Sequence, residues 1–186
     1  MSTLPRLVIL DRDGVINEDS DDYIRSAEEW VPLPGSLEAI ARLNHAGVAV
    51  TVATNQSGVG RGLFSLIELN QMHAKFQHAL ARVGGHVDGI FFCPHAPDAG
   101  CSCRKPAPGL LKAISERFGV ALDGIPMIGD SRRDVEAALA AGARPLLVRT
   151  GKDGRTLEKD PLLAACPVFG DLSAAVDALL YTGGPR

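Results

Sequence analysis

Short apolar runs alternate with longer amphipathic segments along the chain. Five runs rich in Val, Ile, Leu or Phe predict strands over residues 7–10, 48–53, 89–93, 126–128 and 146–148. Apolar residues recur at helical spacing over residues 36–46, 65–83, 108–118, 132–141 and 173–180, which predicts five helices. Strands that alternate with helices favour a parallel sheet covered on both faces. The pattern therefore predicts an α/β protein with a three-layer, Rossmann-like parallel sheet.

Local signals at the ends of the predicted helices agree with this pattern. Ser65 and Glu68 form a Ser-x-x-Glu capping box at the start of the second helix. Glycines stand where three helices are expected to end, namely Gly47, Gly119 and Gly142. No repeat or low-complexity tract interrupts the chain, so residues 1–186 are expected to form one domain.

Composition narrows the classes of function. The chain has 19 Lys and Arg against 22 Asp and Glu, a net charge of −3, which argues against nucleic acid and favours small-molecule partners. Its apolar stretches are shorter than a membrane span, and the run before Asp11 is too short for a signal peptide. We therefore expect a cytoplasmic protein, a monomer, whose four cysteines serve metal binding or chemistry before disulfides.

Polar clusters follow four of the predicted strands. They are Asp11 and Asp13 before Gly14; Thr54, Asn55, Gln56 and Ser57; Arg104 and Lys105 beyond Cys93; and Asp130 and Ser131, with Asp134 beyond. The carboxyl ends of parallel strands meet at one edge, where ligands bind. Taken alone, Asp-x-Asp-Gly fits an ordinary polar turn equally well. The coincidence of four clusters predicts a shared site.

In order and over nearly the whole chain, these clusters resemble the four motifs of the haloacid dehalogenase superfamily of phosphatases. The resemblance implies that Asp11 is the nucleophile that forms an aspartyl-phosphate, and that Asp13 is the general acid and then the base. It implies that Thr54 and Lys105 hold the phosphoryl oxygens. Asp130, with Asp11 and the backbone carbonyl of Asp13, is implied to bind Mg²⁺.

The chemistry of phosphoryl transfer supports these roles independently. Asp11 and a phosphate monoester are both anions, so a cation is needed between them, and Mg²⁺ favours oxygen ligands. Each residue also has an ordinary explanation: Thr54 could end a strand, Lys105 could be solvated, and Asp130 could cap a helix. Their joint occurrence favours the active site. Asp134 either steadies its loop or binds the metal through water.

Three thiols and one imidazole lie within residues 93–103. They are Cys93, His95, Cys101 and Cys103, a set that matches a closed, tetrahedral structural zinc site. The alternative is incidental thiols beside a surface histidine, and Cys166 stands apart as a core or surface residue. Because Arg104 and Lys105 follow directly, we hypothesise that zinc fixes these two cations in the site.

The spacing of the motifs leaves no room for a large inserted cap domain after Asp13 or between Ser57 and Cys93. The resemblance therefore implies a capless member of the superfamily with an open site. Its specificity is expected to come from residues 17–34, residues 56–64 and the zinc loop, since long loops at the carboxyl end of a strand are often functional.

Two groups within the superfamily resemble the chain most: phosphatases that remove the C7 phosphate of a heptose 1,7-bisphosphate, and histidinol-phosphate phosphatases. Residues 54–62 and 148–152 resemble the first group, and Arg61 and Lys152 would add cations that suit a bisphosphate. A loop as short as the five residues between His95 and Cys101 also occurs in the second group. A non-catalytic phosphate-binding domain is a third possibility, although it would not need both Asp11 and Asp13.

Other polar residues near the motifs are expected to contact a phosphorylated sugar. Arg104 is expected to recognise a retained phosphate or hydroxyl groups, whereas Ser131 replaces a lysine of some relatives and should contact substrate more weakly. Val15 replaces a threonine that is common in the superfamily, with little expected effect. The full set of expected substrate contacts is Asp19, Asp22, Thr54, Asn55, Gln56, Ser57, Arg104, Lys105 and Ser131.

Overall fold

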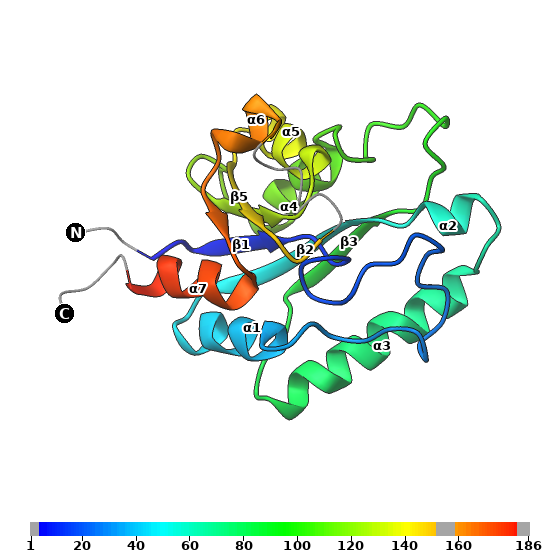
Figure 1. Cartoon of the computed structure of the whole chain (residues 1–186), viewed down its shortest axis with the longest axis horizontal. Helices are drawn as coiled ribbons and strands as arrows, with labels where there is room; N and C mark the ends of the chain where they lie inside the picture. The colour runs from blue at the N-terminus through cyan, green and yellow to red at the C-terminus, as the bar shows by residue number, and fades with distance from the viewer. Residues whose placement is uncertain (1–3, 152–158, 182–186) are drawn as a thin grey trace.

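The computed structural model describes residues 4–151 and 159–181. Its sheet has six strands: β1 (Leu7–Leu10), β2 (Ala49–Asn55), β3 (Gly89–Cys93), β4 (Pro126–Gly129), β5 (Arg144–Val148) and β6 (Val168–Phe169). Neighbouring strands pair in parallel, in the order β3-β2-β1-β4-β5-β6 (Figure 1). The predicted three-layer α/β fold is confirmed.

Helices cover both faces of the sheet (Figure 1). They are α1 (Ser36–His45), α2 (Ser57–Gly60), α3 (Leu66–Arg82), α4 (Gly109–Phe118), α5 (Arg132–Ala141), α6 (Pro161–Ala164) and α7 (Leu172–Tyr181). One core lies between the sheet and α1, α3 and α7, and a second lies between the sheet and α4 and α5. Within the described ranges, no helix has the length and apolar character needed to cross a membrane.

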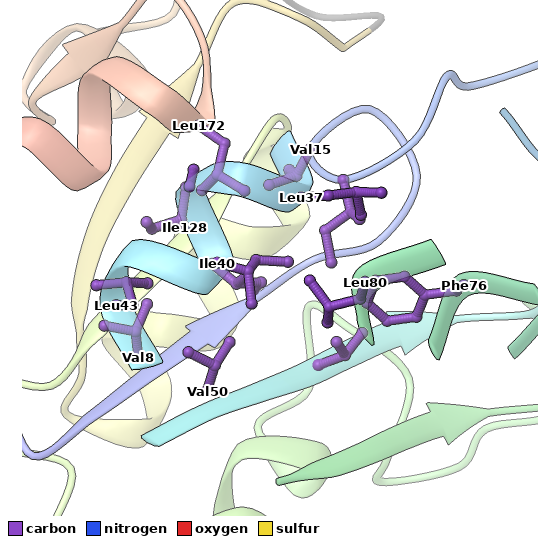
Figure 2. Packing of buried hydrophobic residues seen from close by; sticks show 14 of the residues in the cluster. Val8, Val15, Leu37, Ile40, Leu43, Val50, Phe76, Leu80, Ile128 and Leu172 are labelled. Carbon is purple, nitrogen blue, oxygen red and sulfur yellow. The ribbon is translucent and has the colours of Figure 1, made fainter. Parts of the chain in front are cut away.

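Strand β1 illustrates how the sequence builds both cores. Successive side chains of a strand point to opposite faces, so Val8 and Leu10 pack in the first core and Leu7 and Ile9 in the second. All four are at most 1 % exposed. Figure 2 shows Val8 close to Leu43 of α1 in the first core. Burial on both faces explains why β1 is a continuous apolar run.

The ends of the elements agree with the sequence signals. All five predicted strands and five predicted helices are present, with ends within two residues of the prediction. The capping box of Ser65 and Glu68 is formed at the start of α3, and Gly119 and Gly142 cap α4 and α5 with positive φ. The C-cap of α1 is Ala46, with Gly47 one residue later. Strand β6 and helices α2 and α6 were not predicted, because two strand residues or a single helical turn carry no repeating pattern.

The topology places one edge of the sheet at the expected site. Strand β2, the next strand along the chain, lies on one side of β1, and strand β4 lies on the other side. Ligands bind at such a switch point, outside the carboxyl ends of the strands. Within the described residues, the segments after β1 and β2 contain loops and helices α1, α2 and α3, with no inserted domain. The polar clusters after β1, β2 and β4 therefore meet in an open crevice.

Candidate active site

Asp11 lies at the centre of this edge, directly after β1. Its backbone N–H donates to the carbonyl of Ile128 in β4 at 2.9 Å, which continues the strand pairing past the end of β1. Its Oδ1 accepts the backbone N–H of Arg12 at 2.7 Å and lies 2.9 Å from the Nζ of Lys105. The carboxylate is thus fixed while its side chain remains 12 % exposed toward the crevice.

Lys105 reaches Asp11 from the segment between β3 and α4. Its ammonium group, on a side chain that is 2 % exposed, contacts Asp134 at 2.6 Å and the carbonyl oxygen of Ala53 at 2.8 Å. Its backbone exchanges two 3.0 Å hydrogen bonds with the side chain of Asn55. Burial acts to lower the pKa of Lys105, but the carboxylates of Asp11 and Asp134 outweigh it and raise the pKa. The amine therefore stays charged beside Asp11, the candidate nucleophile.

Asp134 supports both the loop after β4 and the buried lysine. Its Oδ2 accepts the Ser131 hydroxyl at 2.7 Å and the backbone N–H groups of Ser131 and Asp130 at 3.1 and 3.3 Å. Its Oδ1 is paired with Lys105. Burial acts to raise the pKa of Asp134, but Lys105 and Ser131 lower it. Since both oxygens are occupied, the geometry favours the loop-steadying role over metal binding.

Asp11 and Asp130 bring two carboxylates to one point. Oxygen atoms of Asp11, Asp130 and Asp134 all lie within 4.8 Å of one another. Burial, reinforced by the neighbouring carboxylates, raises the pKa of Asp11 to about 7 and that of Asp130 to about 8. A Cβ atom at Gly14 or Gly151 would lie 2.6 or 1.7 Å from Oδ2 of Asp130, so both glycines allow its close packing. A divalent cation with oxygen ligands would offset this charge, and the residues fit magnesium.

Asp13 is held by donors on three sides. Nη2 of Arg12 donates to its Oδ1 at 2.8 Å, the side-chain amide of Asn17 donates to the same oxygen at 2.9 Å, and that of Gln56 donates to Oδ2 at 2.8 Å. The Gln56 amide also donates to Oγ1 of Thr54 at 2.9 Å. Burial acts to raise the pKa of Asp13, but the Arg12 charge and these hydrogen bonds hold it below its usual value. Asp13 is therefore oriented independently of Lys105.

These side chains line a cavity of about 360 Å³. The predicted site residues in its wall are Asp11, Asp13, Asp19, Thr54, Asn55, Gln56, Ser57, Arg61, Arg104, Lys105, Asp130, Ser131 and Asp134. Asp22 does not line this cavity and instead borders a neighbouring hollow with Glu18 and Arg25. Lys152 lies outside the described residues.

Sequence analysis did not single out Arg12, Tyr23 or Arg133, which also line the cavity. Arg12 lies inside the Asp-x-Asp motif, and this position alone could have indicated that it borders the site. Arg133 lies in the first turn of α5, shortly after the Gly-Asp-Ser sequence. Its position at the start of a helix beside the site could have indicated it. Tyr23 is a non-glycine residue with φ of 67°, which composition and periodicity do not reveal.

The cysteine cluster forms as its spacing predicts. Sγ of Cys103 lies 3.2 Å from Sγ of Cys93 and 3.3 Å from Nδ1 of His95, and Cys93 lies 3.6 Å from Cys101. All four ligand atoms lie within 4.8 Å of one another. Three sulfurs and one imidazole nitrogen at this spacing could hold one tetrahedral zinc ion, which leaves no open position for catalysis.

Comparisons with known proteins agree with the geometry. A family model described as polynucleotide kinase 3 phosphatase matches residues 6–131, and one described as HAD-hydrolase-like matches residues 102–175. The D-glycero-β-D-manno-heptose-1,7-bisphosphate 7-phosphatase of Pseudomonas putida is 54 % identical over 175 residues, covering 94 % of this chain and 99 % of the relative. That of Pseudomonas aeruginosa is 56 % identical over 174 residues, covering 94 % and 97 %.

A solved structure shares the whole architecture. The crystal structure of D,D-heptose 1,7-bisphosphate phosphatase from Bordetella bronchiseptica, complexed with magnesium and phosphate, matches with a TM-score of 0.92 and 52 % identity, covering 96 % of this chain and 99 % of that one. The resemblance drawn from the four motifs is thereby confirmed. The chain belongs to the haloacid dehalogenase superfamily, in the family of the D-glycero-β-D-manno-heptose-1,7-bisphosphate 7-phosphatases.

Proposed function

We propose that the chain hydrolyses the C7 phosphate of D-glycero-β-D-manno-heptose 1,7-bisphosphate with Mg²⁺ as cofactor. The observation that carries this proposal is the convergence of Asp11, Asp13, Lys105 and Asp130 in one cavity. They do so in a chain more than half identical, over nearly its full length, to phosphatases named for that substrate. The names of these relatives specify the β anomer, which the sequence alone does not indicate.

The proposed reaction has two steps. First, a carboxylate oxygen of Asp11 attacks phosphorus, and the bond from phosphorus to O7 of the sugar breaks while Asp13 gives its proton to O7. This step needs the protonated form of Asp13, which the lowered pKa makes the minor form in the protein without substrate. Second, the carboxylate of Asp13 takes a proton from water as the water oxygen attacks the phosphorus of the aspartyl-phosphate. The bond between Asp11 and phosphorus breaks, so inorganic phosphate leaves and both carboxyl groups return to their starting states.

The surrounding charges suit this chemistry. Phosphoryl transfer spreads negative charge over the equatorial oxygens, so positioning and positive charge supply most of the catalysis. Lys105 and the hydroxyl of Thr54, which both line the cavity, would stabilise those oxygens. Mg²⁺, held by Asp11 and Asp130 with the backbone carbonyl of Asp13, would supply the charge that lets one anion approach another.

Arginines in the cavity wall would bind the phosphate that the product retains at C1. Burial, followed by the charge of Arg133, lowers the pKa of Arg104, and Nη1 of Arg104 is buried with no hydrogen-bond partner in the part of the chain that the structure describes. Two guanidinium groups that repel one another favour an anion near both. The sugar hydroxyls would then be contacted by side chains that line the cavity, among them Asp19, Asn55, Gln56, Ser57 and Ser131.

Histidinol phosphate is the alternative substrate. Asp19 and Asp21 in the cavity wall would attract its ammonium group, whereas Arg61, Arg104 and Arg133 would repel it. The arginines and the named relatives together favour the bisphosphate. A non-catalytic phosphate-binding domain would need neither the acid nor the base assigned to Asp13.

The experiment that tests the function compares phosphate release from both anomers of the heptose bisphosphate and from histidinol phosphate, with Mg²⁺ present. We expect the largest kcat/KM for the β-bisphosphate and no turnover in Asp11→Asn. A preference for histidinol phosphate would overturn the substrate and leave the chemistry intact. An inactive wild-type protein that binds phosphate would favour the binding domain.

The proposal extends to the whole chain. We regard residues 1–186 as a single catalytic domain, a monomer of the cytoplasm, whose zinc loop spans about residues 93–103. The grouping of Cys93, Cys101 and Cys103 with His95 suits a reducing compartment, where thiols serve metals rather than disulfides. Zinc would be structural, holding the loop that leads to Arg104 and Lys105.

A further inference from the structure

Arg12 stands between the two catalytic aspartates in the sequence, yet its side chain is only 1 % exposed. Its Nε and Nη2 donate to Oδ1 of Asp13 at 3.1 and 2.8 Å, and Nη2 also reaches Oδ2 at 3.2 Å. A buried guanidinium is costly unless it is paired and hydrogen-bonded. The pairing with Asp13 satisfies Nε and Nη2, whereas Nη1 is buried with no hydrogen-bond partner among the described residues.

The backbone after β1 makes this contact possible. The carbonyl of Arg12 accepts the N–H groups of Ile16 at 2.8 Å and Asn17 at 3.2 Å, which closes a tight turn. The turn folds the side chain of Asn17 back onto Asp13. Gln56 approaches the same carboxylate from the end of β2. Both oxygens of Asp13 are thus fixed, and Arg12 supplies three of the five contacts.

We propose that Arg12 is a positioning residue for proton transfer: its planar fork fixes the carboxyl group of Asp13 toward the leaving oxygen of the substrate. The inference rests on the proposed function, because it concerns the proton that Asp13 would give to O7. General acid catalysis requires the proton donor to lie within hydrogen-bond reach of the leaving oxygen. A planar, bidentate guanidinium sets that orientation, whereas the single ammonium group of lysine does not.

The leaving group distinguishes this role from phosphate binding. The sugar alcohol needs a proton to leave, whereas p-nitrophenolate leaves without one. In Arg12→Lys, we expect kcat/KM for the heptose bisphosphate to fall about 100-fold, within the range for general acid catalysis, and kcat/KM for p-nitrophenyl phosphate to fall less than about five-fold. This ratio reports the steps up to departure of the leaving group, so a slower second step does not obscure it. Equal losses with both substrates, or no loss with either, would overturn the proposal.

A double-mutant comparison guards against a general effect on folding. If Arg12 acts through Asp13, Arg12→Lys should add less than about a two-fold loss for the heptose bisphosphate in an Asp13→Asn background, because the effects of two coupled residues do not add. A further loss as large as in the wild-type background would show that Arg12 acts independently of Asp13. Arg42→Lys is the matched control, because Arg42 pairs with Asp177 between α1 and α7, away from the cavity.

Failure of the proposed function would be recognised separately. It would appear as a wild-type protein that does not hydrolyse the heptose bisphosphate. The role of Arg12 would then be tested with any alkyl phosphate that the enzyme accepts, against p-nitrophenyl phosphate. The same contrast between the two leaving groups is expected, and its absence would overturn the role.

Discussion

The Nζ of Lys105 lies 2.6 Å from Oδ1 of Asp134, so a carboxylate on α5 holds the cation that faces Asp11. Side chains of both residues in this pair are 2 % exposed. Oδ2 of Asp134 also accepts two bonds from Ser131, which ties the lysine to the loop after β4. The contact therefore links the cation proposed to bind the phosphoryl group to the loop that carries the candidate magnesium ligand Asp130.

Asp134→Asn is expected to lower stability and activity together. The amide carries no charge to pair with Lys105, and in either orientation its NH₂ group faces a donor, either the ammonium of Lys105 or the N–H group of Ser131. Removing one partner of a buried ion pair costs about 3–5 kcal/mol, and we expect kcat to fall at least about ten-fold. Urea unfolding and phosphate release measure the two effects. Glu136→Gln, which breaks the exposed pair with Arg132 on the same helix, should cost no more than about 1 kcal/mol.

A side chain at position 151 is expected to weaken magnesium binding, because Gly151 packs against Asp130. A Cβ atom at residue 151 would lie 1.7 Å from Oδ2 of Asp130, so Gly151→Ala must displace that carboxylate. We expect the Mg²⁺ concentration for half-maximal activity to rise at least about ten-fold, equivalent to about 1.4 kcal/mol of binding free energy. Gly170→Ala is the control, since its Cβ would meet no atom of the described residues within 4 Å. An unchanged magnesium dependence would contradict the assignment of Asp130.

The fold could be predicted because local and periodic signals agreed. The run from Leu7 to Leu10 is apolar at every position since both faces of β1 are buried, and Ser65 and Glu68 mark the start of α3 within the sequence itself. Strand β6 could not be predicted, because its two residues, Val168 and Phe169, carry no periodic pattern. Its pairing with β5 depends on tertiary contacts alone.

The candidate site was predictable at strand ends and less so elsewhere. Asp11 and Asp130 directly follow strands and Thr54 lies near the end of β2, so the parallel sheet brings them to one edge. The roles of Arg12 and Asp134 depend instead on side-chain direction, which follows from the tight turn after β1 and the first turn of α5. Asp22 illustrates the same limit, because the path of residues 17–34 decides which acidic side chains line the cavity.

Loss of zinc is expected to affect Arg104 more than Lys105. Lys105 is held by Asn55 and Asp134 in addition to the loop, whereas Arg104 directly follows the cluster residue Cys103. In Cys101→Ala, we expect zinc content and turnover to fall together, with a further rise in KM for the bisphosphate. Metal analysis and steady-state kinetics measure these effects. Full activity in a zinc-free variant would contradict the link between the loop and the site.

The control for the zinc loop comes from the remaining cysteine. Cys166 lies outside the cluster, where its thiol donates to the carbonyl of Leu162. Cys166→Ala should retain both zinc content and activity. A loss of zinc in this variant would mean that the metal does not bind at the predicted cluster.

Arg133 is expected to contribute to selectivity for a bisphosphate. Its side chain lines the cavity beside Arg104, near the place proposed for the retained phosphate. We expect Arg133→Gln to raise KM for the heptose bisphosphate about ten-fold with little change in kcat, because binding to a non-reacting group is lost equally in the ground and transition states. The kinetics with a heptose carrying only the C7 phosphate should change little. Arg132→Gln is the matched control, because Arg132 pairs with Glu136 and Asp160 instead.

The buried side chain of His73 is expected to make the folded protein less stable in acid. Its side chain on α3 is 7 % exposed and packs against Phe92, with ring centroids 5.9 Å apart. Burial, followed by the charge of Arg12, lowers the pKa of His73 from 6.5 to about 4, although Asp13 opposes the shift. The unfolded chain therefore binds a proton below about pH 6.5 that the native state does not. Stability from this source is complete above that pH and is lost as the pH falls toward 4.

Urea unfolding at about pH 7.5 and about pH 5 tests this sign. The lowered pKa predicts a loss of about 2 kcal/mol between the two conditions from His73 alone, and about 3 kcal/mol by pH 4. His73→Gln should remove that part of the pH dependence, whereas His78→Gln, at an exposed position of the same helix, should retain it. An equal loss of stability in the wild-type protein and His73→Gln would show that the buried imidazole does not destabilise the fold in acid.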